Sequence, residues 1–225
     1  MKVVLLRSQY LVFIVHTHDV SHRVILNVLQ KLKTALSILN TPLGKISFSV
    51  LVDGDAYTGT SALVEDFLVS PNLPIGMSVG SCSAVLLKAQ FPTTIRELKF
   101  ICRREHAVPY GDRNSGEGLD AQSWDDENHI VMIGTEDADF LGARRPDLKI
   151  RVEDEPIEYL TNGFVISLSQ IPAHKPISLH YVVATNPIPE PADDSVWFAV
   201  DIPHAWLSEQ TKGEQSSAHQ STTAP

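Results

Sequence analysis

The sequence lacks most features that mark a secreted or membrane-spanning protein. Only two cysteines, Cys82 and Cys102, occur in 225 residues, which is too few for a disulfide framework, and their wide spacing fits no usual zinc motif. No apolar run approaches the roughly 20 residues that a membrane helix needs. Arg7 interrupts the apolar N-terminus, and no small-residue cleavage site follows it. We therefore expect a soluble, cytoplasmic protein whose N-terminus belongs to the fold.

Basic charge is also scarce. The chain has 18 Lys and Arg residues against 27 Asp and Glu residues, so its formal net charge is −9. A duplex nucleic-acid binder needs a concentrated basic face to displace counterions from the phosphates. The acidic balance therefore argues against duplex nucleic acid as a partner. Hydrophobic residues make up 43% of the chain, which is ordinary for a globular protein of a length that can bury one core.

The composition changes at two places along the chain. Residues 107–128 are rich in glycine and acidic residues and show no hydrophobic period, which predicts a long internal loop. Residues 208–225 contain Ser, Thr, Gln, Glu and Ala but no larger apolar residue, which predicts a disordered tail. We expect one globular domain over residues 1–207, with a loop at about 107–128, followed by that tail.

The strongest periodic signal lies between Tyr10 and Asp55. Leu11–Val15 and Ile46–Val52 are apolar runs of strand length. Between them, apolar residues from Val20 to Leu39 repeat at helical spacing, after an Asp19 that is well placed to cap the first turn. A right-handed crossover would make the two strands parallel. This stretch therefore predicts a β-α-β unit.

The rest of the chain supplies further helices and then strands. A short helix is expected at residues 61–68 and a second one over residues 94–105, whereas Ile75–Phe91 fits either a strand or a helix. The later strands are expected at His129–Ile133, Leu148–Val152, Phe164–Leu168, Ile177–Ala184 and Val196–Val200. We predict an α/β fold with a mixed sheet, in which the β-α-β unit precedes an antiparallel, strand-rich C-terminal half. The alternative is an α+β protein with a ferredoxin-like N-terminal half.

A group of possible metal ligands follows the first predicted strand. His16 and His18 form an H-x-H pattern, which on a strand points both imidazoles to the same side. Asp19 and His22 come next, and Asp53 would lie at the same carboxyl edge if the two strands are parallel neighbours. Such a set suits zinc or manganese and can activate water. The alternative is structural, with Asp19 as a helix cap and His22 at the edge of the helix's apolar face, since histidines are common at the ends of strands.

A second candidate site is Cys82, which small residues flank on both sides as in a nucleophile elbow. A catalytic thiol would need a base, for which His106 and His129 are the candidates. The alternative is that Cys82 is a small buried residue of a strand. His180 lies in an apolar strand and is expected to be a half-buried, hydrogen-bonded histidine rather than a ligand.

No motif in the chain specifies a reaction. An acidic surface and a long central loop suit partner binding, so we predict a soluble binding or protein-interaction protein. Its partner would be a protein or a small ligand, and neither duplex nucleic acid nor a membrane. The alternative is a metal-dependent hydrolase that uses the His/Asp group at the ends of the first two predicted strands.

Overall fold

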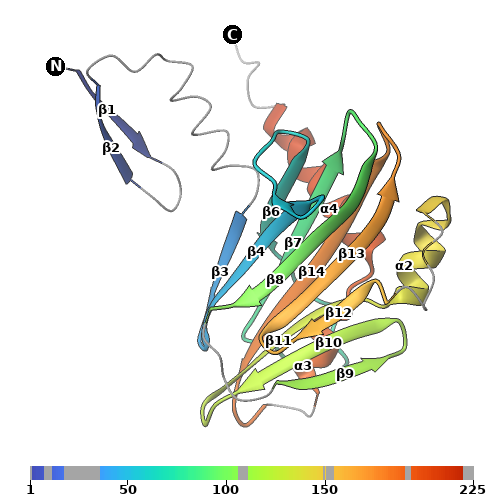
Figure 1. Ribbon diagram of the computed structural model, residues 1–225. Coiled ribbons are helices and arrows are strands. Elements are labelled where there is room, and N and C mark those ends of the chain that lie inside the picture. Colours follow the sequence, from blue (N-terminus) through green and yellow to red (C-terminus); the bar gives the residue numbers. More distant parts are fainter. Residues whose placement is uncertain are drawn as a thin grey trace.

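The described part of the chain consists mainly of antiparallel strands. The computed structural model describes residues 2–7, 12–17, 36–105, 111–148, 150, 155–190 and 194–219. A hairpin of β1 (Lys2–Arg7) and β2 (Val12–Thr17) forms a two-stranded sheet, and the other strands form two sheets of six (Figure 1). Every strand pair in these ranges is antiparallel.

The two large sheets are named here after their central strands. The β8 sheet has the order β12-β13-β8-β4-β3, with β5 beside β4. Its strands are β3 (Leu36–Thr41), β4 (Gly44–Val52), β5 (Asp55–Ala56), β8 (Ile95–Arg104), β12 (Ile157–Leu160) and β13 (Gly163–Ile171). The β14 sheet has the order β6-β7-β14-β11-β10-β9. Its strands are β6 (Ala62–Leu68), β7 (Ser81–Gln90), β9 (Asp112–Gly116), β10 (Leu119–Asp125), β11 (His129–Glu136) and β14 (Pro176–Pro187).

The main core lies between the two sheets. Along β14, alternate side chains such as Leu179 and Tyr181 enter this core, where they meet Phe48 and Phe100 from the β8 sheet. The alternation follows from the two-residue period of a strand. The Tyr181 hydroxyl donates a 2.8 Å hydrogen bond to the Phe100 carbonyl oxygen, so this buried hydroxyl has a partner on the opposite sheet.

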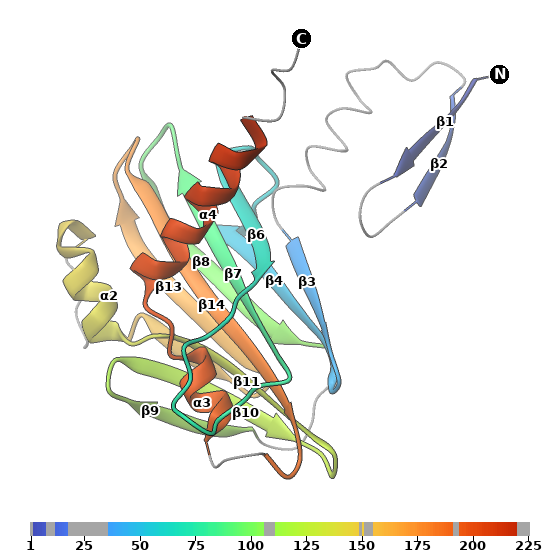
Figure 2. The same cartoon turned by 180° about the vertical axis from the view of Figure 1, so that it is seen from behind.

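A second core lies on the other face of the β14 sheet. The described helices are α2 (Ala138–Arg144), α3 (Ser195–Val200) and α4 (His204–His219), with a short 3₁₀ turn at Pro146–Leu148. Figure 2 shows α3 and α4 lying over this face. Val182 and Ala184 of β14 pack there with Val200 and Leu207. The protein therefore has three layers, and α3 and α4 form the third.

The predicted β-α-β unit is wrong. Residues 36–41, which fall within and just after the predicted helix, form β3 and pair with β4 in a hairpin. The turn at Pro42 and Gly44 closes that hairpin, and Gly44 takes the positive φ of 105° that the turn requires. The two strands predicted to be parallel neighbours correspond to β2 and β4, which belong to different sheets. Residues 18–35, the rest of the predicted helix, lie outside the described residues.

The helices predicted at residues 61–68 and 94–105 are also wrong, because those segments form β6 and β8. Leu98, Phe100 and Cys102 of β8 alternate into the main core, and the strand pairs with β4 on one side and β13 on the other. Cross-strand pairing therefore overrides the helical spacing of its apolar residues. Without these helices, the ferredoxin-like alternative fails as well.

Three further segments differ from their predicted form. Residues 196–200, expected as a strand, lie in α3. The loop predicted at residues 107–128 contains the hairpin of β9 and β10, in which β9 is an exposed, polar edge strand. Helix α4 continues to residue 219 through the start of the predicted tail. In the described chain, no helix is both long and apolar enough to cross a membrane.

Candidate metal centre

Three potential metal ligands meet beneath the start of α4. Glu136 is the last residue of β11, His180 lies within β14, and His204 is the first residue of α4. His180 points to the helix-covered face because it alternates with the core residue Tyr181. One ligand atom from each of the three residues lies within 4.8 Å of the others, so the group could hold a metal ion.

The two imidazoles face each other. Nδ1 of His180 lies 3.0 Å from Nδ1 of His204, and both side chains are buried. Two nitrogens bound to one tetrahedral zinc at about 2.0–2.1 Å stand about 3.3 Å apart. The observed separation is therefore close to that of a bound pair. Without a metal, one ring must donate its Nδ1–H to the other, so the two rings have different tautomers.

Burial keeps both imidazoles neutral. Desolvation, together with a smaller effect of the positive charge of Arg144, lowers the pKa of His180 to about 3. The pKa of His204 is also lowered to about 3, first by desolvation and then by His180 and Arg144. A neutral imidazole is the form that presents a nitrogen lone pair to a metal.

The Glu136 carboxylate is shared with an arginine. Arg144, the last residue of α2, donates from Nε to Oε1 at 3.1 Å and to Oε2 at 3.0 Å, and its Nη2 also pairs with Oε1. An ionised carboxylate has about four lone-pair sites, so this contact leaves some of them for a metal. Ligating carboxylates usually have such an additional hydrogen-bond partner. The arginine charge also opposes cation binding, which sets a limit on the affinity.

The second nitrogen of His204 contacts Ser208. The Ser208 Oγ lies 3.1 Å from Nε2 of His204, one turn further along α4. Ser208 also lines a cavity of about 540 Å³ between α4 and strands β6, β7 and β14. Two cations in the cavity wall are already paired, Lys88 with Glu65 and Arg145 with Asp147. The cavity therefore adjoins the histidine pair through a hydroxyl group, and its walls carry little unpaired charge.

Only two of the five predicted metal ligands, His16 and Asp53, lie in the described part of the chain. His16 lies in β2, whereas His18, Asp19 and His22 lie outside the described residues. Asp53 follows β4, which is in a different sheet from β2, so the shared carboxyl edge that the prediction required does not exist. The Oδ1 of Asp53 accepts the backbone N–H groups of residues 96 and 97 at 2.8 and 2.9 Å. These hydrogen bonds attach the turn between β4 and β5 to β8.

The predicted nucleophile is a buried thiol. Cys82 lies in β7 beneath α3, and its Sγ donates to the Ala199 carbonyl oxygen at 3.4 Å. Desolvation raises the pKa of the thiol to about 12. The strand-to-helix turn of a nucleophile elbow is absent here, because β7 continues to Gln90. His106 lies outside the described residues. His129 is the first residue of β11, and its Nδ1 lies 3.9 Å from Oδ1 of Asp126 in the preceding turn.

Sequence reasoning missed the centre because its members are distant in the chain. His180 is hydrogen-bonded as expected, but it is fully buried rather than half-buried. His204 follows Pro203 without any recognisable metal-binding motif. The only signal was that both histidines stand among apolar residues. Nothing in the spacing indicates that they meet.

Comparisons with protein-family models, curated proteins and solved structures found no match for this chain.

Proposed function

We propose that this protein is a metal-binding protein in which Glu136, His180 and His204 hold one divalent transition metal. Two observations support the proposal most strongly. The Nδ1 atoms of the two buried histidines lie 3.0 Å apart, and one ligand atom from each of the three residues lies within 4.8 Å of the others. Two imidazoles and a carboxylate form a ligand set that zinc commonly uses, and manganese accepts the same donors less tightly. Zinc is therefore the preferred metal.

The metal would connect three elements of the fold. Its ligands come from β11, β14 and α4, so binding would attach the C-terminal helix to the outer face of the β14 sheet. Because the unfolded chain has no such site, a bound metal must raise the stability of the folded state by mass action. This gives the proposal a readout that does not require a known reaction.

Zinc titration of chelator-treated protein tests the proposal. We expect calorimetry to give one equivalent of bound zinc, and we expect the melting temperature to rise with zinc concentration. His204→Asn should abolish both effects. His174→Asn is the matched control, because His174 is exposed and has a positive φ of 60° that asparagine tolerates. A wild-type protein that binds no zinc, or an unchanged isotherm for His204→Asn, would refute the proposal.

Metal-dependent hydrolysis is the second candidate function. Three protein ligands leave a coordination position for water, as in catalytic zinc sites, and Ser208 connects His204 with the adjoining cavity. Zinc-loaded protein should then hydrolyse an activated ester faster than the metal-free protein does. An equal rate of hydrolysis for the two forms would refute metal-dependent hydrolysis, and metal binding would be the only proposed function that is left. A protein or small-ligand partner stays a prediction.

A further inference from the structure

Arg104 is a buried cation that forms no ion pair with any described carboxylate. It is the last residue of β8 and is only 5% exposed. Its Nε donates a 2.9 Å hydrogen bond to the carbonyl oxygen of Leu43 in the β3–β4 turn. Within the described chain, no carboxylate forms an ion pair with this guanidinium. A buried charge in this state is costly unless another group compensates for it.

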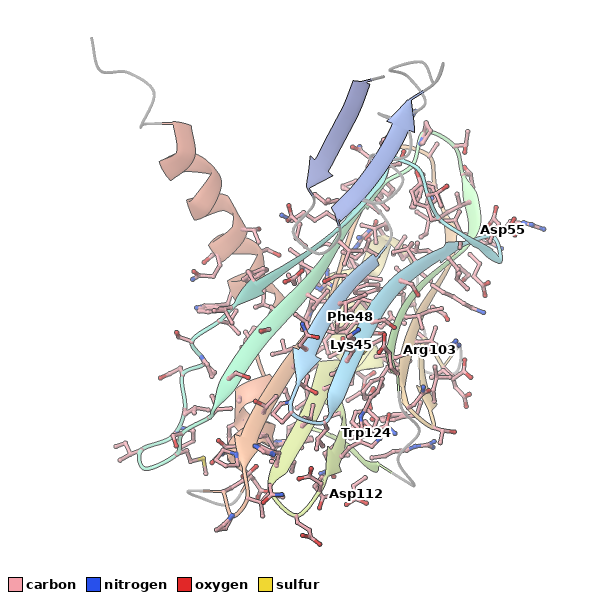
Figure 3. All side chains as sticks on the ribbon, turned by 90° about the vertical axis from the view of Figure 1, so that its left-hand side faces the viewer. Lys45, Phe48, Asp55, Arg103, Asp112 and Trp124 are labelled. Carbon is pink, nitrogen blue, oxygen red and sulfur yellow. The ribbon has the colours of Figure 1, made fainter. Side chains whose placement is uncertain are left out.

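Among the described residues, three buried side-chain atoms of β8 and β10 have no hydrogen-bond partner. They are Nη1 of Arg104, Nε1 of Trp124 and Oε1 of Gln122. The guanidinium carbon lies 6.0 Å from the centroid of the Trp124 ring. Gln122 is two residues before Trp124 on β10, so both side chains point to the same face. Figure 3 shows Trp124 at the end of the sandwich where the β3–β4 turn lies. The atoms offer two donors and one acceptor.

The surrounding protein only partly compensates for the charge of Arg104. Desolvation lowers the pKa of Arg104, and the negative charge of Asp126 opposes that shift from a distance. The Oδ1 of Asp126 is engaged by the backbone N–H groups of Asn128 and His129, both at 2.7 Å. A buried water could satisfy the unpartnered donors, but it would leave the charge uncompensated. An anion satisfies both requirements.

We propose that Arg104 and Trp124 form a binding site for a phosphate group. Nη1 of Arg104 and the indole N–H donate to phosphate oxygens, and the guanidinium supplies the opposite charge. Oε1 of Gln122 accepts the hydroxyl of a singly protonated phosphate, which a carboxylate or a halide ion does not have. The three contacts together therefore select phosphate. This site shares no residue with the metal centre and does not depend on the proposed metal-binding function.

Thermal melts of the full chain test the proposal with inorganic phosphate as the probe. A chelator is present, so that zinc plays no part, and chloride and acetate at the same ionic strength serve as reference anions. At about ten times the dissociation constant, phosphate should raise the melting temperature by about 3–6 °C. Equal shifts from all three anions would overturn the proposal, as would no shift from phosphate.

Two variants and one control locate the effect. Arg104→Met keeps the length of the side chain but removes the charge, and it should abolish the phosphate shift. Trp124→Phe keeps an aromatic ring but removes the indole N–H, and it should weaken phosphate binding several-fold. Arg103→Met is the control, because Arg103 is the adjacent but exposed residue of the same strand (Figure 3). A full shift in Trp124→Phe would overturn the proposal even if Arg104→Met does not fold.

Discussion

Replacing Arg144 with glutamine should tighten zinc binding at the metal centre. The Nε atom of Arg144 lies 3.0 to 3.1 Å from the two Glu136 oxygens, and a zinc ion lies about 2.1 Å from a ligating oxygen. The guanidinium and the metal would then be about 5 Å apart. With an effective dielectric constant of about 20, their repulsion is at most about 6–7 kcal/mol.

The measurable effect should be smaller than that upper bound. The side chains of Arg144 and Glu136 are 23% and 11% exposed, so solvent screens much of the repulsion. We expect the zinc dissociation constant of Arg144→Gln to fall about tenfold to a hundredfold, which is about 1.4–2.8 kcal/mol. The metal-free variant should be less stable than the wild type, because Glu136 loses its partner.

Competition calorimetry with a chelator of known zinc affinity would measure this change. Arg145→Gln is the control, because Arg145 is the next residue along the chain but pairs with Asp147. Weaker zinc binding by Arg144→Gln would refute the electrostatic reasoning. Arg144 would then act mainly by orienting the Glu136 carboxylate.

Three further predictions concern the second core. Burial raises the pKa of Cys82 to about 12 from an ordinary value of 9.0. The native thiol should therefore resist a thiol reagent at neutral pH and react with it only after denaturation. Rapid labelling of the native protein would contradict this prediction. Above pH 9 the unfolded thiol ionises while the folded one stays protonated, so the free energy of unfolding should fall between pH 9 and pH 12. Denaturant unfolding at several pH values in this range, compared with the same series for Cys82→Ala, measures this change. In Gly134→Ala, the added methyl would lie 2.8 Å from Cγ2 of Val200, so we expect α3 to shift and urea unfolding to show a loss of about 1–3 kcal/mol. Gly116→Ala, where nothing lies within 4 Å, should cost less, and equal losses would refute this packing explanation.

Several strands could be predicted from the sequence because their local signal is strong. The apolar runs at Ile46–Val52, Phe164–Leu168 and Ile177–Ala184 all lie within observed strands. Such segments are rich in β-branched residues and are flanked by turn residues, so they can be identified without knowing which strands pair with them. The prediction failed where the apolar residues fitted both the helical and the strand period, as in residues 94–105. Pairing with β4 on one side and β13 on the other makes this segment a strand.

The candidate metal centre shows the same difference between what local sequence determines and what long-range packing determines. The sequence by itself determined the acidic balance and the presence of only two thiols. It also placed His180 in an apolar strand. Only the tertiary structure decided that α4 covers that face of β14, which brings His204 to 3.0 Å from His180. The physical reason is that the strand period determines the two faces of a sheet, whereas long-range packing determines which element covers each face.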